Sequence, residues 1–182
     1  MKTKNFLLLF IIPSYFLFSR DLITETLTIK TEREKITYIE EKELYVYQNI
    51  SLKPNIKTIL CHKPSEALSL PIITLHSNEK LLMSFDDLDA DIKNYYFTII
   101  HCNSDWTTSN LMKSEYIDGF IDESIINYEF SFNTIQKYTH YNFIFPTSHM
   151  KPRISGNYIF KIFDEEGTSI IYKRFRVLDT QL

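Results

Sequence analysis

An acidic run offers the residue types and spacing closest to those of a metal site. Three of its carboxylates stand at alternate positions, the spacing with which a calcium-binding loop begins: Asp87, Asp89 and Asp91. Such a loop also requires a glycine for its sharp turn and a bidentate glutamate at its end, and Ile92 and Thr98 occupy those positions. An EF-hand is therefore excluded, and the run 86–91 predicts an aspartate-rich turn between two strands. Weak, irregular cation binding is the alternative.

Residues with nucleophilic or basic side chains show no catalytic spacing. The five histidines are scattered, so no two imidazoles share a face of a helix or hairpin, and no metal centre is predicted. His101 and Cys102 are neighbours in an expected strand and point to opposite faces. This argues against a nucleophile–base pair and favours a hydrogen-bonded structural histidine. Three carboxylates have the chemistry of a hydrolase, but nothing in their spacing requires them to converge: Asp105, Glu115 and Asp118. We therefore predict no catalytic residue and no cofactor.

A group of aromatic residues is the best candidate for contact with a partner. It lies in and around the segment 107–127, which shows no hydrophobic alternation and is expected to be a long ordered loop with one helical turn. Trp and Tyr are enriched at the energetic centres of protein interfaces. The candidate partner-binding residues are Trp106, Tyr116, Asp118 and Phe120. The alternative is that Trp106, the only tryptophan, closes the end of a sandwich.

Short strands must position these residues. Runs with a period of two, separated by turn signals, recur along the chain: 56–61, 70–75, 80–85, 95–102, 128–132, 141–145, 158–163 and 170–177. In one of them Tyr128, Phe130 and Phe132 alternate with polar residues, which predicts one wet face and one face packed on a partner sheet. The loop 164–167 predicts an antiparallel hairpin between the last two runs. The predicted fold is all-β, an immunoglobulin-like antiparallel β-sandwich.

Composition and the first residues bound the class of protein. The 182 residues suffice for one domain, and a net charge of −3 gives no cationic field for nucleic acid. Three scattered glycines are too few for a nucleotide-binding loop. Two lysines before an apolar run interrupted by Pro13 predict a signal peptide over 1–20, a transmembrane anchor being the lesser alternative. A charged leading arm with one candidate strand at 44–47 follows over 21–52, and the sandwich domain is predicted over 53–179. No cleavage site is evident.

The two cysteines fall in two different predicted strands. An exported protein lies where disulfides persist, so a bridge between Cys61 and Cys102 is one alternative. The other is a pair of buried thiols that behave as small hydrophobic side chains.

Several uncommon strings occur in the order typical of a known family. They are Lys53-Pro54-Asn55-Ile56-Lys57-Thr58, Pro71-Ile72-Ile73, Ser84-Phe85-Asp86-Asp87-Leu88, Tyr96 to Cys102 with Trp106, Ser114 to Phe120, Phe130 to Thr134, Tyr138 to Tyr141 and Ser155 to Tyr158. In these strings the chain resembles the plug proteins of the type IX secretion system of Bacteroidota, from about Lys53 to Leu178. Asn103-Ser104 depart from the Asp-Ala pair usual in that family. Family members continue beyond the strand that ends at Val177, so the chain is expected to represent their first domain alone or a truncated member.

The resemblance implies a function as well as a fold. It implies a periplasmic β-sandwich, associated with the outer membrane, that binds and occludes the periplasmic end of the outer-membrane translocon barrel. Such a protein has no small-molecule substrate and is not an enzyme. The alternative is an exported immunoglobulin-like adhesion or carbohydrate-binding module, which would place a planar row of aromatic residues on one sheet face.

Overall fold

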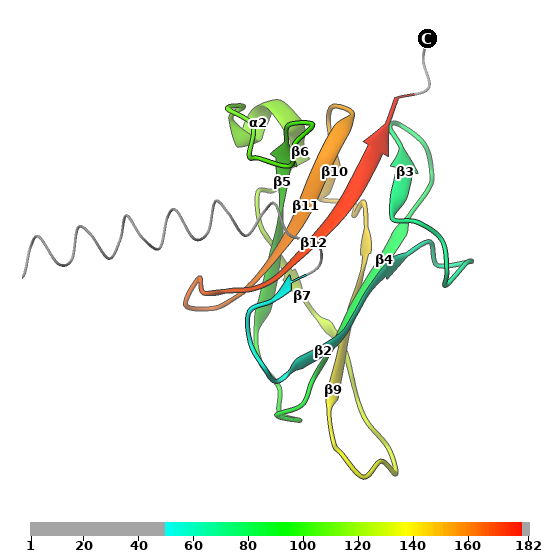
Figure 1. Cartoon of the computed structure of the whole chain (residues 1–182), viewed down its shortest axis with the longest axis vertical. Coiled ribbons are helices and arrows are strands. Elements are labelled where there is room, and N and C mark those ends of the chain that lie inside the picture. The colour runs from blue at the N-terminus through cyan, green and yellow to red at the C-terminus, as the bar shows by residue number, and fades with distance from the viewer. Residues whose placement is uncertain (1–49, 180–182) are drawn as a thin grey trace, which may run out of the picture. The chain divides into compact units, whose positions relative to one another are not determined.

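The computed structural model describes residues 50–179, and they form two packed β-sheets (Figure 1). The predicted signal peptide, and the leading arm as far as residue 49 with its candidate strand, lie outside the described residues. The elements, in chain order, are β1 (Ile50–Ser51), β2 (Ile56–His62), β3 (Ile72–Thr74), β4 (Leu81–Asp87), β5 (Tyr95–Cys102), α2 (Lys113–Tyr116), β6 (Ile117–Gly119), β7 (Glu123–Ile125), β8 (Asn127–Phe130), β9 (Thr139–Phe145), β10 (Met150–Pro152), β11 (Gly156–Asp164) and β12 (Ser169–Leu178). The prediction of an all-β sandwich is confirmed.

The larger sheet has six strands in the order β1-β12-β11-β5-β7, with β3 also paired to β12. β11 lies antiparallel to both β5 and β12, so the predicted hairpin is confirmed. In its turn the Gly167 amide donates to the Asp164 carbonyl over 2.9 Å, and Gly167 has a φ of 81°, which glycine adopts without steric cost. β3 departs from the antiparallel pattern, because it runs parallel to β12.

The smaller sheet has four strands in the order β2-β4-β9-β8, all antiparallel. Its inner face meets that of the larger sheet through stacked aromatic rings. Phe97 of β5 lies 4.0 Å from Phe143 of β9, centroid to centroid, with the ring planes 14° apart. Phe160 and Phe175, on neighbouring strands of the larger sheet, stack at 4.2 Å. Each such buried ring contributes about 1.5–3 kcal/mol from the area that it removes from water, so this aromatic layer stabilises the sandwich.

The chain passes from one sheet to the other through a single residue. β7 pairs with β5 in the larger sheet and ends at Ile125, and β8 pairs with β9 in the smaller sheet and begins at Asn127. Only Ile126 lies between them. Both sheets are therefore joined covalently at this edge.

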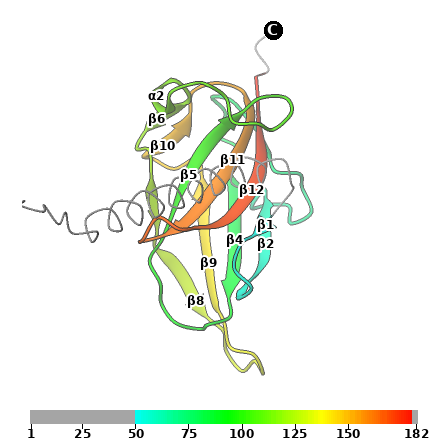
Figure 2. The ribbon, with the colours of Figure 1, turned by 60° about the vertical axis from the view of Figure 1, so that its left-hand side comes forward.

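A small cap of three elements closes one end of the sandwich. α2, β6 and β10 lie together at the top of Figure 1, away from the loop that links β8 to β9 (Figures 1 and 2). β6 pairs with β10, and Met150 of β10 is fully buried. Gly119 has a φ of 104°, and a side chain there would meet the His149 carbonyl oxygen at 1.9 Å. Glycine is thus required where β6 approaches β10.

The segment predicted as a long loop is more regular than its sequence indicated. The expected helical turn is present as α2, but the segment also contains β6 and β7. Strands of three residues are too short to show a hydrophobic alternation, and each forms because a longer neighbour offers backbone partners.

Both cysteines are free and buried. Cys61 lies on β2 of the smaller sheet, and Cys102 lies on β5 of the larger one. The structure therefore favours the alternative of two separate thiols over a disulfide. Burial raises the pKa of each thiol to about 12, which makes the nucleophilic thiolate rare at neutral pH.

Candidate interaction surface

The four predicted partner-binding residues do not lie on one surface. Trp106 packs with Cys102 on the outer face of the larger sheet. Tyr116 is 4% exposed and contacts Tyr158 and His101 in the core. The other two are accessible: the Asp118 carboxylate pairs with Arg153 at 3.0 Å, and the Phe120 ring, 62% exposed, stacks on His149. Tyr116 thus packs in the core, and contact of the other three with a partner stays a prediction.

His101 and Cys102 point to opposite faces of β5, as their adjacency predicted. His101 Nδ1 lies 2.9 Å from Ser109 Oγ, and its ring contacts Tyr158 at 5.1 Å. Burial lowers the pKa of His101, so the imidazole is neutral in the folded protein at neutral pH. His101 is therefore the hydrogen-bonded structural histidine expected from the sequence.

The three carboxylates considered for a hydrolase have separate structural partners. Asp105 Oδ1 accepts hydrogen bonds from the amide and the hydroxyl of Thr107, at 3.0 and 2.6 Å. Glu115 Oε2 accepts from the Met112 amide at the start of α2, at 2.6 Å. Asp118, on β6, pairs with Arg153. Each carboxylate therefore fixes a local turn, helix end or cap, and they do not form a shared cleft.

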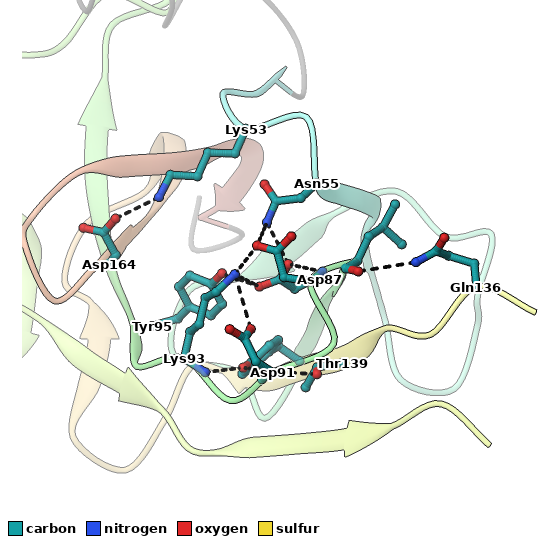
Figure 3. Close-up of polar contacts among 12 residues, drawn as sticks. Lys53, Asn55, Asp87, Asp91, Lys93, Tyr95, Gln136, Thr139 and Asp164 are labelled. Atoms are coloured by element: carbon teal, nitrogen blue, oxygen red, sulfur yellow. Dashed lines mark hydrogen bonds and ion pairs between the residues drawn. The ribbon is translucent and has the colours of Figure 1, made fainter. Parts of the chain in front are cut away.

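The acidic run folds around the ammonium group of Lys93 (Figure 3). Lys93 Nζ lies 2.9 Å from Asp87 Oδ2 and 3.3 Å from Asp91 Oδ1, and it also donates to Asp89 Oδ2. Ligand atoms of the three carboxylates lie within 4.8 Å of one another, and the Asp87 side chain has no exposed surface. A lysine is thus the cation that all three carboxylates contact. The predicted aspartate-rich turn connects the end of β4 to β5.

Asp87 is the centre of this cluster. It accepts hydrogen bonds from Asn55 Nδ2 at 2.7 Å, the Tyr95 hydroxyl at 2.8 Å and the Asp89 amide at 3.0 Å. Burial opposes its ionisation, but these bonds and Lys93 outweigh burial and lower the pKa of Asp87. Burial likewise opposes the charge of Lys93, yet its carboxylate partners raise the pKa of the lysine. Both groups therefore stay charged, and the cluster holds the turn against Asn55, the residue just before β2.

A row of apolar side chains along β8 is exposed, contrary to the sequence prediction. The strand exists, but its aromatic face was expected to pack on a partner sheet. Instead Tyr128 is 39% exposed, Phe130 56% and Phe132 93%. Tyr128 and Phe130 belong to the inner face of their sheet, since Tyr128 pairs with the buried Tyr141 at a ring distance of 6.0 Å. The larger sheet does not extend over this part of the inner face.

We give the name β8 apolar row to a group of exposed apolar residues, two of them on β8 and one on either side of the strand. It consists of side chains at alternate positions: Ile126, Tyr128, Phe130 and Phe132. Exposed Ile135, in the loop that follows, lies close to it in sequence. β8 is the outermost strand of its sheet, with β9 as its partner. An outermost strand presents backbone donors and acceptors that can pair with another chain, so the row combines an apolar face with a pairing edge.

No helix within residues 50–179 is long and apolar enough to cross a bilayer.

The two packed sheets, with antiparallel pairing except for β3, and the aromatic core between them define a β-sandwich. Residues 56–179 match the family described as the type 9 secretion system plug protein, first domain. The chain therefore belongs to this family of the type 9 secretion system. Comparison with curated protein sequences finds no match.

One solved structure supports the same fold. A hypothetical protein from Parabacteroides merdae ATCC 43184, determined at 2.30 Å, is 29% identical and superposes with a TM-score of 0.69. The match covers 72% of this chain and 34% of that one, so this chain spans about a third of its relative's length. A DNA glycosylase from Pseudomonas fluorescens bound to DNA containing an abasic site analogue also matches, at 8% identity over 68% of this chain and 30% of that one. Its TM-score of 0.31 carries no argument about fold or function.

Proposed function

We propose that this chain is a non-enzymatic component of the type IX secretion system that binds and occludes the periplasmic end of the outer-membrane translocon barrel. Membership of the plug protein family is the observation that carries the proposal. The mechanism is steric: a packed sandwich seats against the barrel mouth, and no covalent bond is made or broken. The protein acts in the periplasm, at the outer membrane.

The β8 apolar row supplies the contact surface. Tyr and Phe side chains that leave water on binding contribute about 1.5–3 kcal/mol each before the costs of association. Phe132 is 93% exposed and Ile126 76%, so most of this area is available to a partner. Monomeric proteins rarely expose aligned apolar side chains of this size unless the surface binds something.

An exported immunoglobulin-like adhesion or carbohydrate-binding module is the second candidate. Alternate aromatic residues on one sheet face are the feature that favours it. Sugar rings stack on a flat aromatic platform, however, and the rings of Tyr128 and Phe130 lie 73° apart in an edge-to-face arrangement. This geometry presents no continuous plane, so it favours a protein partner.

The test measures both binding and occlusion. The purified translocon barrel is reconstituted in a planar bilayer, and its conductance is recorded as the chain is added to the periplasmic side. We expect the chain to bind the barrel and to reduce the conductance. The double variant Phe130→Ser and Phe132→Ser should weaken both effects about tenfold or more, since two apolar anchors are lost.

The matched control is Leu68→Ser, at a residue that is 98% exposed and lies outside the β8 apolar row. It should bind as the unchanged chain does. A second double variant, Trp106→Ala with Phe120→Ala, tests the partner residues predicted from the sequence. Normal conductance in the presence of bound chain would contradict occlusion, and binding to immobilised glycans without binding to the barrel would favour the second candidate.

A further inference from the structure

A pocket of about 300 Å³ lies beside β12 of the larger sheet, where that strand has no partner on one side. β12 pairs with β11 along one edge, and both β1 and β3 lie on the other. β1 pairs with Ile171 and Tyr172 of β12, and β3 pairs with the β12 residues from Arg176 to Leu178. The pocket opens at the interval between them, with the segment 70–72 and Trp106 as its walls.

Two guanidinium groups face this pocket. The Arg174 guanidinium carbon lies 4.2 Å from the centre of the Trp106 ring, and that of Arg176 lies 5.7 Å from it. Side chains alternate along a strand, so both arginines share the outer face of β12, and Phe175 between them belongs to the core. The described residues that line the pocket also include Lys173.

The arrangement holds two like charges close together on an aromatic ring. Burial lowers the pKa of Arg174, and the charge of Arg176 acts in the same direction. An anion that contacts both guanidiniums would offset their repulsion. The planar donors of arginine fit a carboxylate through paired hydrogen bonds, more closely than they fit a spherical ion.

We propose that this pocket binds the carboxylate of an acidic segment of a partner protein, held by Arg174 and Arg176. The hydrocarbon part of the acidic side chain lies against Trp106 and Leu70, which is 70% exposed at the rim. The volume is at the lower end for ligand pockets, and it accommodates one side chain. An extended anionic membrane surface would face the whole chain, whose net charge of −3 opposes it, whereas a short acidic segment meets only the pocket; a protein segment is therefore favoured over a lipid headgroup.

This inference goes beyond the proposed function. The pocket lies on the larger sheet, and the β8 apolar row lies on the smaller one. Loss of either site therefore leaves the other to be measured separately.

Trp106 provides the test, because it is the only tryptophan and its ring is a wall of the pocket. Its fluorescence is followed as the full chain is titrated with an N-acetylated, C-amidated peptide in which two glutamates flank a leucine. The same peptide with glutamines in place of the glutamates is the isosteric control. We expect a saturable change with the acidic peptide and an affinity at least tenfold lower for the glutamine peptide.

The variant Arg176→Gln should weaken binding of the acidic peptide about tenfold, since a charge-assisted contact is lost. Arg153→Gln is the matched control, because that arginine pairs with Asp118 outside the pocket, and it should bind the peptide unchanged. Arg176 is exposed, and circular dichroism should show both variants folded. The variant Trp106→Phe has no tryptophan signal, so its binding of the acidic peptide is measured by calorimetry. Calorimetry of the unchanged chain checks that the fluorescence change reports binding.

Three outcomes would overturn the proposal. One is the absence of a saturable response, and another is equal affinity for the two peptides. The third is a response confined to inorganic phosphate or to phosphatidylglycerol vesicles, which would assign the site to a free ion or a membrane surface.

Discussion

Lys93 Nζ lies 2.9 Å from Oδ2 of Asp87, a carboxylate whose side chain has no exposed surface. The lysine is 31% exposed and reaches inward from the loop before β5. The acidic run resembles the start of a calcium loop, but this pair uses it to link the end of β4 to the loop before β5.

Replacement of Asp87 by Asn should destabilise the fold. The variant leaves Lys93 facing two carboxylates in place of three and weakens the acceptor for Tyr95 and Asn55. We expect a loss of about 3 kcal/mol, at the lower end for a broken buried ion pair because Lys93 is partly hydrated. Urea unfolding measures this loss. Asp118→Asn, which removes an exposed pair, should change the free energy of unfolding by less than about 0.5 kcal/mol. Equal effects would contradict the central position of Asp87.

Stability should fall in two steps as the pH is lowered. The pKa of His101 is lowered by burial, so the unfolded chain takes up a proton first, below about pH 6.5, and folding loses free energy. The pKa of Asp87 is lowered in the fold as well, so its contribution is present above about pH 4 and is lost below that pH. Unfolding series between pH 7 and pH 3 should show both steps. The second should shrink in Asp87→Asn, and an unchanged second step would assign it to other carboxylates.

Calcium and chelators should leave the melting temperature unchanged. The Lys93 ammonium already contacts all three carboxylates, and a metal ion would have to displace it. Lys93→Ala should lower the melting temperature and make it rise again on addition of millimolar calcium, because carboxylates within 4.8 Å of one another then repel. A calcium-dependent melting temperature in the unchanged chain would contradict this account.

Both thiols should react slowly while the protein is folded. Burial raises the pKa of Cys61 and of Cys102 to about 12, so little thiolate is present at pH 8. Reaction with a chromogenic disulfide reagent should be slow in buffer, and in urea it should be fast and reach two thiols per chain. Rapid reaction of one thiol in buffer would show local opening of its strand.

Tyr116 and Phe120 should differ in their effect on stability, although the sequence places them in one group. Tyr116 is 4% exposed and packs on Tyr158, so Tyr116→Ala should cost about 3 kcal/mol through the cavity that it leaves. Phe120 is 62% exposed, and Phe120→Ala should cost less than about 1 kcal/mol. Thermal unfolding of the two variants compares them, and similar losses would show that Phe120 supports the cap.

Much of the sandwich could be predicted because its long strands carry their own pattern. The run from Tyr95 to Cys102 was predicted with both bounds, and the hairpin at Gly167 followed from its turn residues. The three-residue strands could not be found in this way, because their pairing depends on neighbours distant in sequence. β10, for example, is held by β6.

The candidate sites were harder to predict than the strands. Alternation shows that Tyr128 and Phe130 share a face, but it cannot show whether the opposite sheet extends far enough to cover that face. The pairing of Lys93 with the acidic run was missed, although a lysine four residues after Asp89 was a readable signal. The meeting of Trp106 with Arg174 joins segments that no local pattern connects.

The passage of the chain between sheets at Ile126 has a mechanical consequence. The sheets of a sandwich resist sliding only through side-chain packing unless the backbone ties them together. Here a force applied to β8 is transmitted through Ile126 into β7, and from there along the hydrogen bonds to β5 in the larger sheet. The edge that carries the β8 apolar row therefore resists shear. This property suits a surface that is proposed to press against a partner protein.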